Sequence, residues 1–278
     1  MADTDITIAV IAKNEADRID ALLRSVAFAA EVIVVDSGST DGTQAICRRY
    51  GARVIETHWR GYAGQKQFAM EQASSQWVLN LDADEAVSEA LAAEVQTAVK
   101  RAVSETAAFS MPRLSKYLGR WIRHGGWYPD RKIRLIRKGA GRWEGEGLHE
   151  ALVVSGKTAR LSAPILHYVY RHIFDQVATI NQFSEIYAAE RKMAGPWYVI
   201  AGLGHALGKI FECYVWKRGI LDGLPGLIIA VNSAFYVFLK HAKTWEQGLN
   251  KDGPVKNQIG DGKVKSSRCG AIKPAPEE

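Results

Sequence analysis

The sequence predicts an α/β fold in which a mostly parallel sheet is flanked by helices and followed by a helical region. Apolar, β-branched runs alternate four times with helix-spaced segments over residues 6–101, a pattern typical of parallel strands joined by crossover helices. From about residue 174 to 243 the pattern is mostly helical. The composition, 47% hydrophobic and 24% charged, excludes a disordered, collagenous or coiled-coil chain.

Each predicted element follows from its residue pattern. Buried strands are expected at the short apolar runs 6–12, 31–36, 52–57 and 77–82. Helices are expected over 16–29, 43–50, 62–74 and 88–101, where apolar residues recur with helical spacing or capping residues open the segment. After residue 105 the pattern changes to short strands with Gly-rich turns, at 107–114, 132–137, 151–156 and 164–170. These strands extend the sheet.

Two apolar stretches, residues 196–216 and 224–239, stand out in the helical region. From Gly223 to Leu239 the chain has 17 uncharged residues, the lower limit for crossing a bilayer. Pro225 and Gly226 weaken that interpretation. The alternatives are a core helix of a helical subdomain and an element lying in the membrane interface. In the second case the headgroup-level residues would be Trp197, Tyr214, Trp216, Lys217, Arg218 and Lys240.

Charge is distributed unevenly along the chain. Residues 1–112 hold 10 Lys and Arg against 16 Asp and Glu, whereas residues 113–143 hold 10 Lys and Arg against one Asp. Such a basic, aromatic-rich segment suits anionic headgroups or a phosphorylated substrate, and the alternative is a solvated surface. No nucleic-acid-binding signature is present, so nucleic acid is not an expected partner. The acidic N-terminal sequence lacks the features of a secretory signal.

Acidic and polar residues follow three of the predicted parallel strands. Asn14 and Glu15 follow the first, Asp36 ends the second, and Asp82 and Asp84 follow the fourth. Ligands of such sheets bind at the carboxyl ends of the strands. The Asp-Ala-Asp triplet is a weak motif alone, but at this edge two carboxylates can hold a hard divalent cation together with diphosphate oxygens.

Several of these segments occur in the order found in a known family. The first strand with its Asn-Glu, VVDSGSTDGT, and GQKQFAMEQASSQWVLNLDADE together resemble the family 2 glycosyltransferases, inverting enzymes with the GT-A fold. The resemblance covers roughly residues 5–170. Downstream, RKIRLIRKGAGRWEGEGLHEAL, ILHY and LDGLPGLIIAVNSAFYVFLKHAKTWE look like the lipopolysaccharide core β-glucosyltransferases, which act on an inner-core heptose at the cytoplasmic face of the inner membrane.

The resemblance implies roles for individual residues. The donor nucleotide would be bordered by Ile11, Ala12, Asn14, Glu15, Asp36, Lys66, Gln67 and Asp82. Asp36 would bind the uracil, and Asp82 would touch the ribose or the metal. Asp84 would bind the Mg²⁺ or Mn²⁺ ion directly, with His167 completing the metal shell, meeting the diphosphate or lying as a core histidine. Lys66 stands where the family commonly has an arginine, which keeps the charge but not its bidentate geometry.

An inverting transfer also needs a base and an acceptor site. The acceptor hydroxyl must lose a proton as it attacks the anomeric carbon, and one carboxylate suffices. The candidates are Asp130, Glu144, Glu146 and Glu150; Glu150 is preferred, with His149 beside it as orienter or acceptor contact. Arg131, Arg134 and Arg137 are expected to alternate on one face of a strand and to meet acceptor phosphates together.

The sequence thus predicts a metal-dependent, inverting glycosyltransferase that moves a hexose, glucose by resemblance, from a UDP-sugar to an inner-core heptose of the lipid A-core. We expect a donor-binding half over residues 1–105, an acceptor-binding half over 106–173, a membrane-associated helical region over 174–245 and a flexible tail over 246–278. Two alternatives remain open. One is the same chemistry on another glycan or a polyprenyl phosphate, and the other is a non-catalytic protein that binds a nucleotide-sugar or an anionic membrane.

Overall fold

The computed structural model describes residues 5–145, 150–191 and 195–249. Within these ranges the chain forms two compact units. The first contains residues 5–114 and 129–168, and the second contains residues 115–128 and 169–249.

The first unit is built on a twisted sheet with the strand order β3-β2-β1-β4-β8-β6-β12-β5. Its first four strands are parallel, as the alternating pattern predicts: β1 (Ile6–Ala12), β2 (Glu31–Asp36), β3 (Arg53–Glu56) and β4 (Trp77–Asp82). Every residue of β1 is buried, which is typical of a central strand covered on both faces.

Beyond β4 the sheet becomes mixed. β8 (Asp130–Arg137) runs antiparallel to both β4 and β6 (Thr106–Tyr117), and β12 (Ile165–His167) runs antiparallel to the short β5 (Glu85–Val87). β11 (Lys157–Arg160) pairs parallel with β6. A separate hairpin is formed by β9 (Gly141–Glu144) and β10 (Ala151–Val154).

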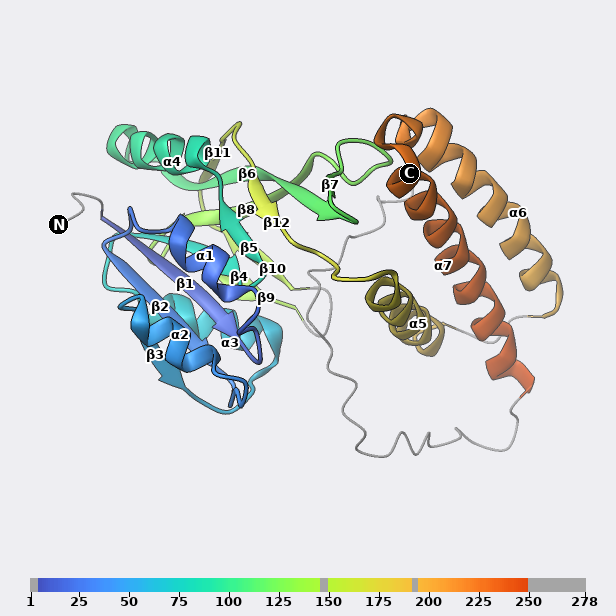
Figure 1. Cartoon of the computed structure of the whole chain (residues 1–278), viewed down its shortest axis with the longest axis horizontal. Coiled ribbons are helices and arrows are strands. Elements are labelled where there is room, and N and C mark those ends of the chain that lie inside the picture. The colour runs from blue at the N-terminus through green and yellow to red at the C-terminus, as the bar shows by residue number, and fades with distance from the viewer. Residues whose placement is uncertain (1–4, 146–149, 192–194, 250–278) are drawn as a thin grey trace. The chain divides into compact units, whose positions relative to one another are not determined.

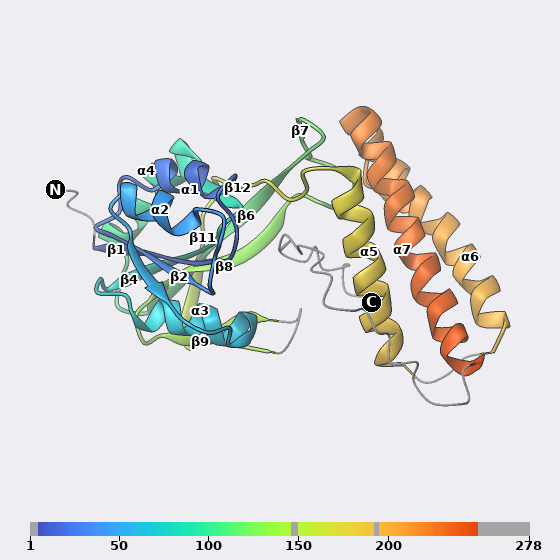
Figure 2. The ribbon, with the colours of Figure 1, turned by 60° about the horizontal axis from the view of Figure 1, so that its bottom comes forward.

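Helices cover both faces of the sheet, which confirms the predicted fold class. Helices α1 (Ile19–Ser25), α2 (Thr43–Arg49) and α4 (Glu89–Arg101) contribute Leu22, Cys47 and Leu91 to one core layer. On the opposite face, α3 (Gly61–Glu71) packs with the β9–β10 hairpin and contributes Met70 to a second layer. Figures 1 and 2 show the two layers on either side of the strands.

The second unit is mainly helical. It contains α5 (Ile173–Ala189), α6 (Trp197–Phe211), a π-helical turn (Glu212–Trp216), a 3₁₀ turn (Gly219–Asp222) and α7 (Gly223–Leu249). β7 (Arg120–Trp121) pairs with the last residues of β6. Helix α7 packs against both α5 and α6. A Cβ added to Gly202 of α6 would lie 2.6 Å from the Cβ of His241, so this glycine allows the close approach of α6 to α7.

The apolar side chains of helix α7 lie on two faces that differ in burial. Ile229 and Val237 are buried against the neighbouring helices, whereas Leu227, Val231 and Phe235 are exposed. Within the described residues, the segment Gly219–Leu249 is long and apolar enough to cross a membrane by length and composition. The helix therefore has one packed apolar face and one uncovered apolar face.

Candidate active site

The strand register brings the predicted polar residues to one edge of the sheet. Asp36 lies beside Ala12 in the β1–β2 pair, and Asp82 lies beside Ile11 in the β1–β4 pair. The carboxyl ends of these parallel strands therefore meet, as expected for a ligand-binding edge.

The loops after β1 and β2 are tied to each other by hydrogen bonds. Asn14 has a left-handed backbone (φ 56°), which asparagine tolerates better than most residues. Its Oδ1 accepts from the Thr40 N–H at 2.8 Å, and its own N–H donates to Ser39 Oγ at 2.8 Å. Glu15 is 3% exposed, and its N–H donates to Thr43 Oγ1 at 2.9 Å. These contacts fix the two loops that the resemblance assigns to the nucleotide.

Asp36 organises the turn that follows β2. Its Oδ1 accepts from the N–H groups of Gly38 and Ser39, at 3.1 and 2.8 Å, and from Gln44 Nε2 at 2.8 Å; its Oδ2 accepts from Ser39 Oγ. The carboxylate is completely buried. In this structure it caps the turn, and contact with a uracil stays a prediction.

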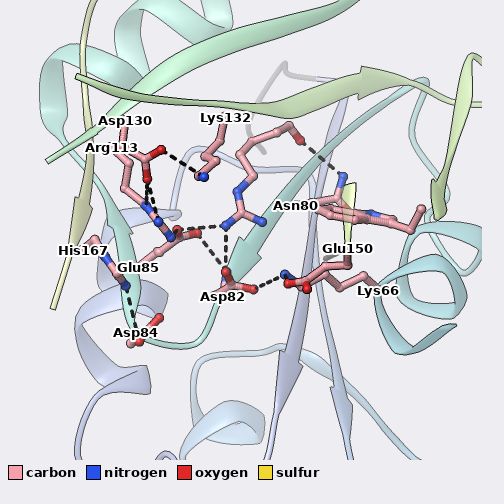
Figure 3. A network of polar contacts seen from close by, with 12 residues as sticks. Lys66, Asn80, Asp82, Asp84, Glu85, Arg113, Asp130, Lys132, Glu150 and His167 are labelled. Atoms are coloured by element: carbon pink, nitrogen blue, oxygen red, sulfur yellow. Dashed lines mark hydrogen bonds and ion pairs between the residues drawn. The ribbon is translucent and has the colours of Figure 1, made fainter. Parts of the chain in front are cut away.

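A buried ionic network lies at the ends of β4 and β8 (Figure 3). Lys66 of α3 is 6% exposed, and its Nζ lies 2.8 Å from Asp82 Oδ1 and 3.3 Å from Glu150 Oε1. Arg134 Nη2 lies 2.7 Å from Asp82 Oδ2 and 3.0 Å from Glu85 Oε1. Both oxygens of Asp82 are therefore paired with cations, and Lys66 joins it to the residue predicted to be the base.

Glu85 and Arg113 extend this network into the core. Arg113 Nη1 lies 3.3 Å from Glu85 Oε1, and its Nη2 lies 2.6 Å from Asp130 Oδ2. Lys132 Nζ approaches the other oxygen of Asp130 at 2.9 Å. Buried ion pairs seldom stabilise a fold more than apolar packing would. A network of buried ion pairs at a ligand-binding edge therefore points to a functional site.

The network shifts the ionisation of its members. Burial alone would raise the pKa of Asp82, but Arg134 and Lys66 outweigh it and hold that pKa well below its usual value. Burial would also raise the pKa of Asp130, but the charges of Arg113 and Lys132 outweigh burial and lower that pKa. Burial and the charge of Arg113 lower the pKa of Lys132. Asp82 and Asp130 are thus held as carboxylates.

Asp84 and His167 lie next to the network, and the β5–β12 pairing brings them together. His167 is paired with Glu85 in the strand register, and its Nε2 lies 3.6 Å from Asp84 Oδ2 (Figure 3). The other oxygen, Asp84 Oδ1, is buried and has no hydrogen-bond partner in the described part of the chain. No group of three or more His, Cys, Asp and Glu side chains suited to a metal occurs among those residues. A cation here would have two protein ligands and would complete its shell from water and substrate.

Several other predicted residues lie apart from this centre. The Gln67 amide donates to Glu71 and accepts from the Trp143 N–H at 2.9 Å, so it supports β9. Glu144 forms an ion pair with Arg142 at 2.6 Å. Two predicted residues, Glu146 and His149, lie outside the described residues.

The expectation that Arg131, Arg134 and Arg137 share one face of a strand is wrong. Residues three apart in a regular strand point to opposite faces, so Arg134 would face away from the other two in any case. Neighbouring residues of β6, Ser110 and Phe109, pair with Ile133 and Leu135 of β8, so Arg134 is the extra residue of a β-bulge. The bulge places Arg131 and Arg137 on opposite faces. Arg131 Nη1 donates to the Leu161 carbonyl, Arg137 stacks on Trp77, and Arg134 is buried in the ionic network.

Sequence reasoning missed four buried residues of the site: Arg18, Gln65, Glu85 and Arg113. Gln65 Nε2 donates to Ser37 Oγ at 3.0 Å from α3, and Arg18 Nη1 lies 3.4 Å from Asp84 Oδ2. The only local signal for Glu85 is its place directly after the Asp-Ala-Asp triplet. Nothing in the sequence distinguishes Arg113 from the other cations of the basic segment.

The mixed sheet thus gathers carboxylates just after β1 and at the ends of β2 and β4, at the edge where sheets of this kind bind their ligands. Residues 7–151 match glycosyl transferase family 2, and this match covers more than half of the chain. The protein belongs to that family.

Relatives match over most of the chain. The lipopolysaccharide core biosynthesis glycosyltransferase LpsC of Rhizobium meliloti (strain 1021) is 32% identical over 253 residues, covering 88% of this chain and 93% of the relative. An uncharacterized glycosyltransferase of Rickettsia typhi is 30% identical and covers 88% of each. A mannosyltransferase of Pyrobaculum calidifontis, solved with GDP-Man and Mn²⁺, has a TM-score of 0.50, 15% identity and 88% coverage of both chains. That likeness confirms the GT-A fold.

Proposed function

We propose that this glycosyltransferase moves a hexose, glucose in our assignment, from a UDP-sugar to a heptose of the lipopolysaccharide inner core, with inversion at the anomeric carbon. The observation that supports it most is the Lys66 bridge. One buried ammonium group contacts both Asp82, on the donor side, and Glu150, the assigned base. The two functions that a single displacement needs are therefore adjacent.

Each charged residue has a role in the proposed displacement. Glu150 accepts the proton of the acceptor hydroxyl as its oxygen attacks the anomeric carbon. Asp84 and His167 would hold a Mg²⁺ or Mn²⁺ ion, and that ion would stabilise the charge on the departing UDP. The unpartnered Asp84 Oδ1 fits this assignment, because hard cations bind carboxylate oxygen. Lys66 and Arg134 orient Asp82 toward the donor.

The assignment to the lipopolysaccharide core rests on similarity to the core biosynthesis glycosyltransferase of R. meliloti, which covers 88% of this chain, and heptose is our choice of acceptor within that core. Fold alone does not define an acceptor, because the same scaffold serves many. We place a phosphorylated core near Arg131, which is exposed on β8.

We also propose that the helical unit attaches the enzyme to the cytoplasmic face of the inner membrane. The outer faces of α6 and α7 expose large apolar side chains, including Trp197 (77% exposed), Leu207 (70%) and Leu224 (67%). Trp216, in the turn between the helices, is 77% exposed, and Lys217 and Arg218 follow it. Exposed apolar side chains on neighbouring helices are typical of a surface that contacts a membrane or another protein. Aromatic and basic residues beside it are typical of an interfacial helix.

A donor screen tests the proposed function. Purified protein with Mn²⁺ or Mg²⁺ receives UDP-glucose, UDP-galactose, UDP-N-acetylglucosamine or a GDP-sugar, each with lipopolysaccharide truncated to its inner-core heptose, and nucleotide release is measured. We expect release from UDP-glucose that requires both the cation and the heptose-bearing acceptor, and a β-linked product by NMR.

Each other outcome of the screen overturns a defined part of the proposal. Release from another donor overturns the glucose assignment, and release only with a different acceptor, such as a polyprenyl phosphate, overturns the pathway. Full activity in the presence of a chelator overturns the metal role. UDP binding with no transfer from any donor would favour the non-catalytic alternative.

A further inference from the structure

Arg18 is a buried arginine whose guanidinium group has one nitrogen without a hydrogen-bond partner in the described residues. It precedes α1 and is 8% exposed. Its Nη1 lies 3.4 Å from both Asp84 Oδ2 and the Tyr168 carbonyl oxygen, and its Nε lies 4.0 Å from Glu15 Oε2. Its Nη2 is buried and donates to no group in the described residues. A buried donor without a partner is rare in native proteins and calls for an explanation.

Asp84, the partner of Arg18 in this contact, is a buried acceptor with one unpaired oxygen. Its carboxylate is 3% exposed, Oδ2 faces Arg18 and His167, and Oδ1 has no partner among the described residues. The 3.4 Å separation from Arg18 is long for a charge-assisted hydrogen bond, which is usually about 2.7–2.9 Å. Arg18 and Asp84 are therefore neighbours that satisfy each other incompletely, each with one free polar atom.

A ligand that pairs with both Arg18 Nη2 and Asp84 Oδ1 must bring an anionic oxygen to the first and a cation to the second. A divalent cation binds a carboxylate oxygen, and a phosphate oxygen accepts from a guanidinium edge. We propose that Arg18 binds a diphosphate oxygen of the donor while Asp84 holds the metal ion, so that binding replaces their long mutual contact with two stronger ones. This inference rests on the proposed function and adds a diphosphate-binding residue to it.

The charges predict effects of opposite sign on the two ligands. Without nucleotide, the positive charge of Arg18 opposes a cation at Asp84, so its removal strengthens binding of Mn²⁺ alone. With nucleotide, Arg18 attracts the diphosphate, so its removal weakens UDP binding. A purely structural role for Arg18 would weaken the binding of both ligands, because the site would lose its shape.

The test compares Arg18→Met and Arg18→Lys with wild type and with Arg24→Met. Arg24 is an exposed arginine of α1, and its side chain is 71% accessible. Mn²⁺ binding without nucleotide is measured by electron paramagnetic resonance, and UDP binding at saturating Mn²⁺ by calorimetry. Circular dichroism checks that each variant is folded.

For Arg18→Met we expect UDP affinity at least about tenfold weaker, the loss of one charge-assisted hydrogen bond, and Mn²⁺ affinity several-fold stronger. Arg18→Lys keeps the positive charge but loses the planar guanidinium group. Its affinity for UDP should therefore be weaker, while its affinity for Mn²⁺ without nucleotide stays near that of wild type. If Arg18→Met does not fold, the Arg18→Lys variant tests the inference. Arg24→Met should match wild type in both assays.

Three results would overturn the inference. UDP affinity within twofold of wild type in the Arg18 variants would show that Arg18 does not contact the diphosphate, and the proposed function would stand. Weaker binding of both Mn²⁺ and UDP would assign Arg18 a structural role. Absence of UDP binding by the wild-type protein would refute the proposed function and this inference together.

Discussion

Glu85 is the residue on which the buried network depends most, and its substitution by glutamine gives a quantitative prediction. The side chain is completely buried. Its Oε2 accepts from the Asp82 N–H at 3.0 Å, and its Oε1 lies 3.3 Å from Arg113 Nη1 and 3.0 Å from Arg134 Nη2. Glutamine preserves the size but removes the charge, and its NH₂ group must face either the Asp82 N–H or the two guanidinium groups.

The expected loss follows from the partners that remain. Removing one member of a buried ion pair costs about 3–5 kcal/mol. Arg113 keeps Asp130 and Arg134 keeps Asp82, so the lower end applies. We therefore expect the free energy of unfolding to fall by about 3 kcal/mol in Glu85→Gln, a change of more than about 100-fold in the unfolding equilibrium.

Urea unfolding, followed by tryptophan fluorescence and far-UV circular dichroism, measures this loss. The matched control is Glu56→Gln, at the exposed end of β3, which should differ from wild type by less than about 0.5 kcal/mol. A lower midpoint at unchanged slope indicates lost stability. If Glu85→Gln lost less than about 1 kcal/mol, the network would not be the tightly coupled structure described above.

Three further predictions concern pH, the metal and the membrane. Arg134 and Lys66 lower the pKa of Asp82 in the folded protein, so the unfolded state binds more protons in acid. The free energy of unfolding should therefore decline as the pH falls below about 3.8, the ordinary pKa of an aspartate. In acid unfolding, the free energy of unfolding of Asp82→Asn should decline less steeply than that of wild type. Asp84→Asn should fold normally yet bind Mn²⁺ at least about tenfold more weakly by electron paramagnetic resonance, and unchanged affinity would place the metal elsewhere. The substitutions Leu207→Ser in α6 and Trp216→Ser in the turn that follows it should together reduce flotation with vesicles containing phosphatidylglycerol. Flotation equal to wild type would show that neither α6 nor this turn contacts the membrane.

The sequence was sufficient to predict the strand-end carboxylates because their position depends only on local pattern. Asp36 and Asp82 close apolar strands, and parallel strands with crossover helices bring such ends together. Lys66 was predicted on the family resemblance. Its pairing with Asp82 and Glu150 depends on the packing of α3, which no local pattern encodes.

The arginines of β8 show what a strand pattern can and cannot predict. Alternation alone puts Arg134 on the face opposite Arg131 and Arg137. The bulge at Arg134 has no glycine or proline to mark it, yet it changes the faces of Arg131 and Arg137. Glu85 and Arg113 acquire their roles through the pairing of β5 with β12 and of β6 with β8. Such antiparallel pairings join segments distant in sequence, so the ion pairs within them are visible only in three dimensions.

The most direct test of the proposed chemistry compares Glu150→Gln with Glu144→Gln, since both carboxylates are candidate bases in the segment from β9 to β10. Transfer of glucose from UDP-glucose to heptose-terminated lipopolysaccharide is measured for each variant, together with UDP affinity. We predict that Glu150→Gln binds UDP like wild type but transfers at least about 100-fold more slowly, the contribution of a general base, while Glu144→Gln transfers at nearly the wild-type rate. Wild-type transfer by Glu150→Gln, or its loss only in Glu144→Gln, would contradict the assignment of the site.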